Sequence, residues 1–221
     1  MSQTFQNYID GRWCASASGQ YFDNHNPSNW DEIIGRFPHS NQIDLGQAVT
    51  SARGAFAPWR AVPAPKRGEI IKRAGDLLQQ HKEELATLMT REMGKVLLET
   101  RGDVQEGIDT AYYAATEGRR LFGRTAPSEL PNKFCMSVRV PIGVAGIITP
   151  WNFPLAITTR KIFPALVCGN TVVFKPASDT PATATRFVEI LLEAGLPANV
   201  IQLVHGSGSA VGMPLVEHEE V

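Results

Sequence analysis

The sequence of 221 residues has almost no net charge, because 21 Lys and Arg residues stand against 22 Asp and Glu residues. This balance argues against the broad basic surface on which sequence-independent binding to nucleic acids or anionic membranes depends. No apolar run reaches the roughly 20 residues of a membrane-spanning helix, and residues 1–13 lack the basic segment and apolar core of a secretory signal. We therefore expect a cytoplasmic protein that binds neither nucleic acid nor membrane.

Cysteine is scarce and histidine is scattered. The cysteines are odd in number and form no C-x-x-C pair, so the sequence supports neither a disulfide framework nor a structural zinc site. The histidines lack the i, i+4 spacing that places two ligands on one helix face. We expect no metal site, reduced thiols at Cys14, Cys135 and Cys168, and solvated or capping roles for His25, His39, His81, His205 and His218.

Apolar residues make up 43% of the chain and charged residues 19%. This composition is sufficient for a sizeable core, in one large domain or two small ones. Near the start of the chain, Asp10-Gly11 stands between short β-prone runs. Because this dipeptide readily adopts the positive φ angles of a tight turn, it predicts a hairpin.

Helical spacing of apolar residues dominates the next part of the chain. The pattern begins after Asn41, which is a predicted N-cap, and the helix should end near Pro58. A second helix should begin around Pro65, a residue tolerated in the first turn. Further helical segments follow between residues 85 and 115. We predict a helical amino-terminal part that comprises residues 1–122 and packs on the rest of the protein.

Residues 123–140 interrupt this helical pattern. Pro127 and Pro131 break it, and the segment KFCMSVRV then alternates in part between apolar and polar residues, as in a half-exposed strand. We predict an extended arm or hairpin. Two interpretations stay open: the segment adds to the sheet edge of another subunit, or it is an edge strand within its own chain.

From residue 141 the chain repeats a strand followed by a helix. The strands are the short apolar runs GVAGIIT, TVVF and NVIQLV; the first helix ends at Gly169, and the second begins at Pro181 with Thr180 as predicted N-cap. Helix-length connections between buried strands are typical of parallel β-α-β units. We predict an α/β fold for residues 141–221, a Rossmann-type parallel sheet with flanking helices, that binds its ligand at the carboxyl ends of the strands. A sheet that stops at its third strand leaves an exposed edge.

Polar residues suited to a site follow two of these strands. In TPWNFP, two prolines hold Asn152 in a rigid loop; its amide is a neutral donor that can stabilise an oxyanion, although such a string also forms purely structural turns. Lys175 ends the second strand, where it can donate to ribose hydroxyls or phosphate or be simply solvated. The spacing of Gly206, Gly208 and Gly212 is G-x-G-x-x-x-G, which departs from the ordinary dinucleotide fingerprint and is a weak signal by itself.

Taken together in this order, the motifs resemble the NAD(P)-dependent aldehyde dehydrogenase family. The matching segments are NYIDGRW, GIITPWNFPLA, KIFPALVCGNTVVFKPASDTP and EAGLPANVIQLVHGSG, and the resemblance extends over residues 5–221. It implies oxidation of an aldehyde to a carboxylic acid, with Asn152 holding the aldehyde oxygen and residues 123–140 forming the oligomerisation hairpin of a homo-oligomer. It also implies a site for NAD or NADP formed by Ile148, Thr149, Pro150, Trp151, Lys175, Ala177, Ser178, Gly208 and Gly212.

In this family a cysteine thiolate attacks the aldehyde and a glutamate activates water, and the resemblance places both residues beyond Val221. We therefore expect a fragment that does not oxidise aldehydes by itself. Cys168 is not a substitute, because ALVCGN is an apolar helix end with no nearby His or cation to lower the thiol pKa. The alternative is a non-catalytic dinucleotide-binding or assembly module.

The resemblance also suggests two hypotheses about specificity. Ser178 stands where many NAD-preferring members carry a glutamate that repels a 2′-phosphate, so the enzyme should tolerate or prefer NADP; the alternative is that Ser178 only caps a turn. Arg160 matches the position where members acting on succinate semialdehyde place an arginine against the substrate carboxylate. A carboxylated aldehyde is therefore the preferred substrate class, and the alternative is a surface arginine paired with a neighbouring acid.

Overall fold

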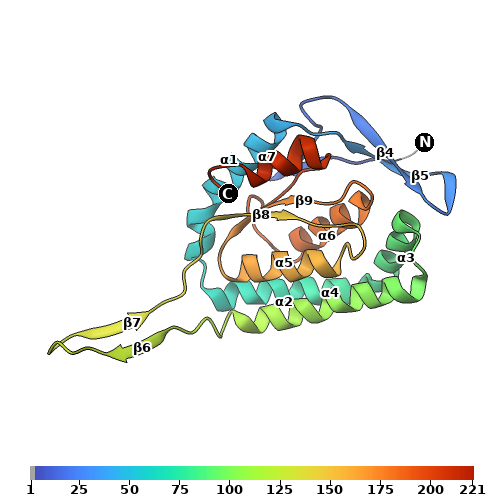
Figure 1. The fold of residues 1–221 in the computed structure, drawn as a ribbon. Coiled ribbons are helices and arrows are strands. Elements are labelled where there is room, and N and C mark those ends of the chain that lie inside the picture. Colours follow the sequence, from blue (N-terminus) through green and yellow to red (C-terminus); the bar gives the residue numbers. More distant parts are fainter. Residues whose placement is uncertain (1–2) are drawn as a thin grey trace.

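A five-stranded sheet lies at the centre of the computed structural model, which describes residues 3–221 (Figure 1). In spatial order the strands are β3 (Arg12–Cys14), β2 (Asn7–Ile9), β10 (Ile201–Leu203), β9 (Thr171–Lys175) and β8 (Val144–Ile148). β8, β9 and β10 are parallel, as predicted, whereas β2 runs antiparallel to β10. The third strand of the repeat is therefore not an edge; within the described residues the edges are β3 and β8.

The turn between β2 and β3 confirms the predicted hairpin. Asp10 and Gly11 have φ angles of 53° and 74°, the left-handed values that a two-residue type I′ turn requires. A side chain at Gly11 would lie 2.7 Å from Oδ1 of Asn199, in the loop that precedes β10. The hairpin therefore closes against the end of the third β-α-β unit.

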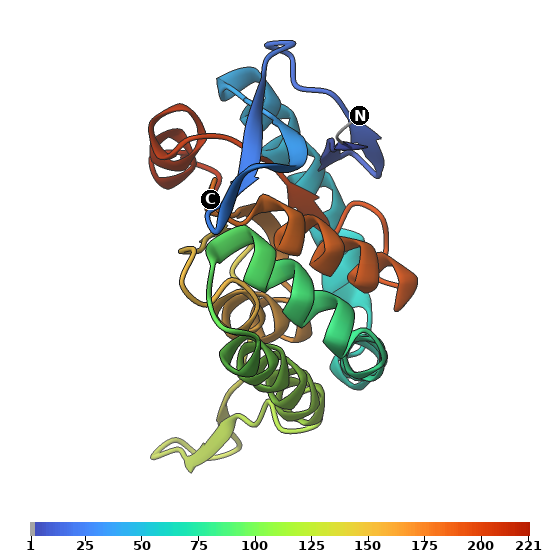
Figure 2. The ribbon, with the colours of Figure 1, turned by 90° about the vertical axis from the view of Figure 1, so that its right-hand side faces the viewer.

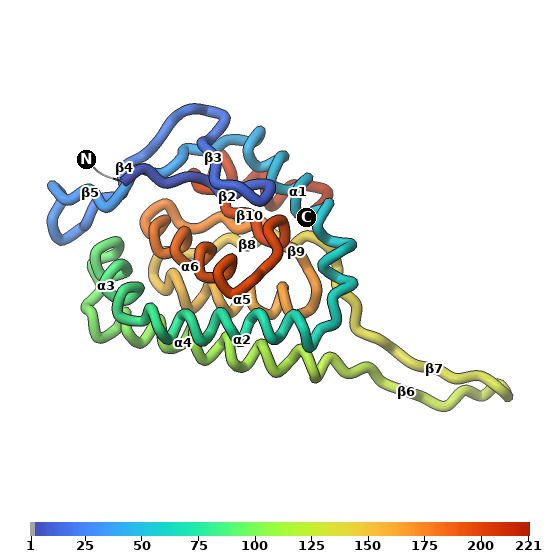
Figure 3. Tube along the Cα trace, turned by 180° about the vertical axis from the view of Figure 1, so that it is seen from behind, coloured from blue at the N-terminus to red at the C-terminus, as the bar shows by residue number. Residues whose placement is uncertain are grey.

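Helices cover both faces of the sheet (Figures 1 and 3). One face packs against α1 (Gln42–Ala61), the short helix η1 (Gly208–Gly212) and α7 (Met213–Val216). The other face packs against α5 (Ala156–Val167) and α6 (Pro181–Glu193). Outside α5 and α6 lie α2 (Ala64–Gln80), α3 (Lys82–Met93) and α4 (Leu97–Glu117). Alternate residues of β9 point to opposite faces of the sheet and pack into the hydrophobic cores on those faces. Phe174 is buried on the α5 and α6 side and Val173 on the α1 side, as expected of a parallel strand covered on both faces.

The amino-terminal part is not wholly helical, contrary to the expectation from the sequence. β1 (Gln3–Thr4), β5 (Asn29–Pro38) and β4 (Tyr21–Asn26) form a second sheet in this order. Figure 2 shows the hairpin of β4 and β5 beside the green helix α3. The buried residues of β5 do not alternate with exposed ones, so the period of two that marks a strand in sequence is absent.

Helix α1 begins as predicted and ends later than predicted. The side chain of Asn41 caps it, and Asp44 completes the capping box by accepting from the Asn41 amide over 3.0 Å. The helix continues past Pro58 for one more turn. Trp59 explains this, because its indole is 2% exposed and donates to the carbonyl of Leu166 over 3.2 Å. Tertiary packing thus offsets the hydrogen bond that proline removes.

Residues 123–140 form an arm that projects from the body (Figure 1). Its strands, β6 (Arg124–Pro127) and β7 (Phe134–Ser137), pair only with each other, and every residue of both strands is exposed. The arm is therefore not an edge strand of the central sheet, which was one of the two interpretations. Its apolar side chains have no cover within the described chain.

Candidate functional site at the strand ends

The carboxyl ends of β8, β9 and β10 lie side by side. Ile148 and Lys175 are partners at the ends of β8 and β9. The amide of Thr149 donates to the carbonyl of Lys175 over 3.3 Å, and the amide of Val204 donates to the carbonyl of Phe174 over 2.9 Å. These bonds continue the sheet into its loops, so the predicted site residues from three loops meet at the edge where open α/β sheets bind ligands.

The first loop presents Asn152 to solvent. Trp151 is 53% and Phe153 39% exposed, while Thr149 is buried. Within the described chain, the side-chain amide of Asn152 is exposed and makes no hydrogen bond, whereas its backbone carbonyl accepts one from Lys95 over 2.6 Å. The loop therefore keeps its backbone fixed and its amide donor free, as an oxyanion-binding residue requires.

Lys175 reaches the same edge from a buried position. The residue is 5% exposed, and burial lowers the pKa of its ammonium, an effect that the nearby charge of Asp179 opposes. The stem of Lys175 is therefore buried, whereas a simply solvated lysine would be exposed along its length. In residues 3–221 its ammonium has no hydrogen-bond acceptor, so it is available to a polar ligand.

The loop after β9 is tied to the loop after β10. The hydroxyl of Ser178 donates to the carbonyl of Gly206 over 3.2 Å, and the amide of Thr180 donates to the carbonyl of Ala177 over 3.3 Å. Ser178 thus bridges two loops rather than capping its own turn. Its hydroxyl oxygen retains lone pairs, and its proton can turn to another acceptor.

Glycine permits close packing at this edge. A Cβ atom at Gly212 would lie 3.9 Å from Ile148 and 4.0 Å from Lys175, so residues far apart in the sequence surround one small space. Gly208 has no neighbour within 4 Å of such an atom. Gly206 has a φ of +145° and packs closely against Ser40. Gly212 therefore lies beside Ile148 and Lys175, and Gly208 borders open space at the other end of η1.

Arg160 lies apart from these loops, on the exposed side of α5. Its guanidinium forms an ion pair with Glu106 of α4 at 2.5 Å, and both side chains are about half exposed. No contact joins Arg160 to Asn152 or to the strand-end residues in the described chain. The structure therefore contains the pairing with a neighbouring acid that was the alternative role for Arg160.

Glu92, rather than Thr180, caps helix α6. Thr180 occupies the N-cap position but its side chain makes no capping hydrogen bond. The buried carboxylate of Glu92 accepts instead from the amides of Ala182 and Thr183 over 2.7 Å and 2.8 Å, and from the hydroxyl of Thr183 over 2.6 Å. Burial raises the pKa of Glu92 to about 7 in spite of these bonds. A cap supplied by another helix leaves no local signal in the sequence.

His205 is buried directly after β10, so the expectation of a solvated or capping histidine is wrong here. Its Nε2 lies 3.2 Å from Oγ1 of Thr185, and its Nδ1 is buried without a partner in the described chain. Burial and the charge of Lys175 lower the pKa of His205 to about 3. The imidazole is therefore neutral at pH 7. The apolar pair Leu203-Val204 before it was the available signal of burial.

Cys168 is a half-buried thiol at the end of α5. The expectation that no cation lies nearby is wrong, because Arg67 and Arg139 both act to lower the pKa of the thiol. Burial outweighs them and raises that pKa. Because the thiolate is the nucleophilic form, the raised pKa supports the structural role expected for Cys168.

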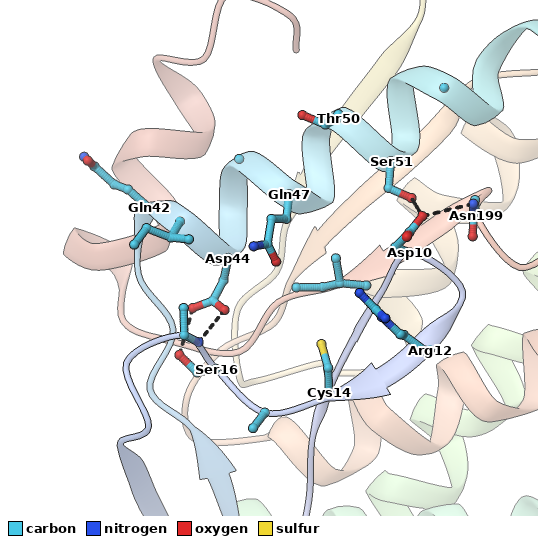
Figure 4. Close-up of a pocket in the computed structure, with 16 residues that line it drawn as sticks. Asp10, Arg12, Cys14, Ser16, Gln42, Asp44, Gln47, Thr50, Ser51 and Asn199 are labelled. Atoms are coloured by element: carbon cyan, nitrogen blue, oxygen red, sulfur yellow. Dashed lines mark hydrogen bonds between the residues drawn. The ribbon is translucent and has the colours of Figure 1, made fainter.

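A hollow of about 810 Å³ lies elsewhere, between α1 and the β2–β3 hairpin (Figure 4). Asp44 and Asp10 are engaged there: Asp44 accepts from Ser16 over 2.8 Å, and Asp10 accepts from Ser51 over 3.2 Å. The hollow contains none of the predicted site residues. Residues 3–221 also contain no cluster of potential metal ligands, and no helix among them is long and apolar enough to cross a membrane.

Comparisons with known proteins show which family the chain is similar to. The model of the aldehyde dehydrogenase family matches residues 13–221. The chain is 44% identical over 218 residues to the alpha-ketoglutaric semialdehyde dehydrogenase of Bacillus subtilis (strain 168), covering 99% of this chain and 45% of the relative. It is 39% identical over 213 residues to an NADP(+) succinate-semialdehyde dehydrogenase of Escherichia coli (strain K12), covering 96% of this chain and 44% of the relative.

Solved structures show the same fold. An NADP-dependent enzyme from E. coli superposes with a TM-score of 0.95 at 38% identity, covering 99% of this chain and 45% of that one. A betaine aldehyde dehydrogenase from Staphylococcus aureus in complex with NAD+ gives a TM-score of 0.94 at 36% identity, covering 98% and 44%. The chain therefore spans less than half the length of the relatives that it matches.

Proposed function

The chain belongs to the aldehyde dehydrogenase family, and we propose that the protein containing it oxidises an aldehyde to a carboxylic acid with NAD or NADP. The observation that carries this proposal is the meeting of three loops at one sheet edge. The edge combines the free amide of Asn152 with the ammonium of Lys175 and the small space beside Gly212. An oxyanion donor thus adjoins a place for a polar cofactor.

The residues at this edge fit a dinucleotide. Lys175 has a buried stem and an ammonium without an acceptor in the described chain, so it can donate to ribose hydroxyls. Gly208 leaves open space in front of η1. When bound, the cofactor supplies the hydride acceptor. Asn152 donates a hydrogen bond to the aldehyde oxygen as negative charge develops there.

The covalent step is not assigned to this chain. Cys14 lies on β3, Cys135 on the exposed arm and Cys168 after α5, and none of them lies at the carboxyl ends of β8, β9 and β10. Burial also raises the pKa of Cys14 and of Cys168. We infer that residues 1–221 bind the cofactor without oxidising aldehyde, and that the nucleophile comes from sequence outside them.

Titration of the 221-residue chain with NAD and NADP tests this assignment. We expect the fluorescence of Trp151 to report binding, no formation of reduced cofactor on addition of aldehyde, and weaker binding by Lys175→Met. Lys133→Met, which removes a lysine of the arm, is the matched control. Binding that Lys175→Met leaves unchanged contradicts the cofactor site, and oxidation of aldehyde by the chain alone contradicts the external nucleophile.

A non-catalytic dinucleotide-binding or assembly module is the second candidate, which the lack of a cysteine at the strand ends favours. The intact mass of the native gene product separates the two. A mass near 24.2 kDa supports the module. A mass roughly twice that leaves room for a further domain, and thiol-dependent oxidation of aldehyde by that product supports the dehydrogenase.

The cofactor preference that we propose is tolerance of, or preference for, NADP. Ser178 adds no negative charge, and its hydroxyl can leave the Gly206 carbonyl for a phosphate oxygen. Ser178→Glu should weaken binding of NADP about tenfold relative to NAD through charge repulsion. Ser128→Glu places the same charge on the arm, away from the strand ends, as a control. Tighter binding of NAD than of NADP by about tenfold or more in the unmodified protein refutes the preference.

The substrate class that we propose is an aldehyde with a carboxylate at its other end. Arg160 is exposed, and its guanidinium can exchange Glu106 for a substrate carboxylate through two parallel hydrogen bonds. The relatives include enzymes named for such semialdehydes. In the active gene product, kcat/KM for a semialdehyde should exceed that for an uncharged aldehyde of equal length, and Arg160→Met should remove the difference. Equal values of kcat/KM for the two aldehydes in the unmodified enzyme refute the proposed substrate class.

The arm is proposed to assemble copies of the protein in the cytoplasm. Phe134, Met136, Val138 and Val140 are 65% to 74% exposed and alternate with polar residues. Burying them against a second copy removes this apolar surface from water. Light scattering should show an oligomer that Phe134→Asp dissociates; Lys133→Asp, a neighbouring substitution to the same residue, is the control. A monomer at micromolar concentration contradicts the proposal.

A further inference from the structure

Lys95 contacts the loop that carries Asn152, although 57 residues separate them in the sequence. Lys95 lies in the short connection between α3 and α4. Its Nζ donates to the backbone carbonyl of Asn152 over 2.6 Å and lies 3.8 Å from the ring centroid of Phe153. One ammonium therefore makes a charge-assisted hydrogen bond and a cation–π contact to consecutive residues.

The two ends of this loop are fixed by other groups. At its start, the amide of Thr149 donates to the carbonyl of Lys175 over 3.3 Å. At its end, Asp103, which is 1% exposed, accepts from the amide of Ala156 over 2.7 Å. Between these points, the carbonyl of Asn152 has Lys95 as its hydrogen-bond partner in the described chain. The orientation of the Asn152 peptide therefore depends on Lys95.

We propose that Lys95 is a positioning residue for Asn152: by holding the backbone carbonyl of Asn152, its ammonium sets the direction in which the side-chain amide donates to the aldehyde oxygen. The proposal rests on the proposed function, in which Asn152 is the oxyanion donor. Catalytic groups act efficiently only when held within about 0.5 Å of their productive positions. An exposed asparagine on a loop therefore needs an anchor of this kind.

Nuclear magnetic resonance on the 221-residue chain tests the anchor directly. Lys95→Met removes the charge and keeps the length of the side chain. Lys82→Met is the matched control, because Lys82 also makes a single bond to a neutral oxygen, that of Gln105, over 2.7 Å. We expect the order parameter of the backbone N–H of Asn152 to fall from about 0.85 to below about 0.6 in Lys95→Met but not in Lys82→Met.

Two further readouts separate anchoring from general destabilisation. The melting temperatures of Lys95→Met and Lys82→Met should agree, and Lys95→Arg, which keeps a donor and a cation, should restore most of the order at Asn152. An order parameter at Asn152 that Lys95→Met leaves unchanged overturns the proposal. Equal loss of order throughout the chain, with a lowered melting temperature, overturns it as well.

Kinetics of the active gene product that contains these residues test whether the anchor acts through Asn152. Lys95→Met should lower kcat about tenfold, with little change in KM for the cofactor, because the lost contact serves the transition state. The double variant with Asn152→Ala should lose no more than Asn152→Ala alone. If the fold-losses in kcat of the two single variants multiply in the double variant, the two residues act independently and the positioning role is refuted. If Asn152→Ala leaves kcat unchanged, the proposed role of Asn152 as oxyanion donor is wrong. The order parameter at Asn152 shows separately whether Lys95 anchors the loop, so the two failures can be told apart.

Discussion

Residues 141–221 and the arm of residues 123–140 are adjacent in the chain but differ in what their apolar side chains contact. In the former, β9 is buried on both faces, and Phe174 is 0% exposed. In the latter, Phe134 is 74% exposed and every residue of both strands faces solvent. Helices of the same chain cover the sheet region on both faces, whereas the apolar side chains of the arm have no cover within the described residues.

A second difference concerns polar groups. In the sheet region, groups from other elements support the loops. The buried Glu92 carboxylate of α3 accepts from Thr183, and the half-buried Lys95 after α3 donates to Asn152, while the buried His205 imidazole contacts Thr185. The arm has only its own ladder and surface bonds, such as that from Arg139 to the carbonyl of Phe122. The comparison teaches that other elements fix the loops of the site, whereas the strands of the arm are supported only by each other within the described residues.

The largest effect should come from truncating matched aromatic residues in the two regions. Phe174→Ala empties a packed position in β9 and should lower the free energy of unfolding by about 3–5 kcal/mol. Phe134→Ala on the arm should change it by less than about 0.5 kcal/mol in a monomer. Denaturant unfolding at low protein concentration measures both. Similar losses for the two variants mean that the arm packs on its own chain.

The next effect is a loss of stability in acid that originates at His205. Its pKa is lowered from 6.5 to about 3 in the folded protein, so below pH 6.5 the unfolded state binds a proton that the folded state does not. Stability due to this group is present above pH 6.5 and is lost as pH falls towards 3. Relative to His205→Gln, the unmodified chain should lose about 2–3 kcal/mol between pH 7 and pH 4.5.

The measurement is denaturant unfolding of both proteins across this pH range. The difference between them isolates His205, because Glu92 and Asp103 have raised pKa values and titrate with the opposite sign in both. A constant difference from pH 7 to pH 4.5 contradicts the buried neutral imidazole. The arm contains no histidine, so it adds nothing to the result.

A smaller effect distinguishes the two possible caps of α6. Glu92→Ala leaves the amides of Ala182 and Thr183 buried without an acceptor and should cost about 2 kcal/mol. Thr180→Ala should cost less than about 0.5 kcal/mol, because the threonine side chain makes no capping bond. Thermal unfolding at pH 7 compares them. A larger loss in Thr180→Ala restores the assignment made from the sequence.

The parallel strands could be predicted from sequence because their burial is a local property. The runs around Val144, Val172 and Ile201 are apolar and of strand length, and helix-length connections separate them. The Asp10-Gly11 turn was also predictable, since its φ angles follow from the residue types. The second sheet was missed because β5 lacks alternation.

The positions of Asn152 and Lys175 at one edge followed from the expected topology, but the contacts that hold them did not. Lys95 reaches Asn152 across 57 residues, and Glu92 reaches Thr183 across 91. Such partners depend on how α3 and α4 pack against the sheet region, and no local pattern encodes this. The buried state of His205 could not be predicted from its residue type, because histidines occur both in protein cores and on protein surfaces.

The smallest expected effect concerns Arg160, which is exposed like the arm but lies on the sheet region. Its ion pair with Glu106 is about half exposed on both sides, and such pairs contribute little. Arg160→Met should therefore change the free energy of unfolding by less than about 0.5 kcal/mol. The control is Arg119→Met, because Arg119 is another exposed arginine, whose guanidinium lies 3.9 Å from the carboxylate of Glu69. Denaturant unfolding that shows a loss above about 1 kcal/mol at Arg160 alone assigns the pair to stability. A negligible loss leaves the guanidinium free to exchange Glu106 for the carboxylate of a ligand, which the proposed substrate class requires.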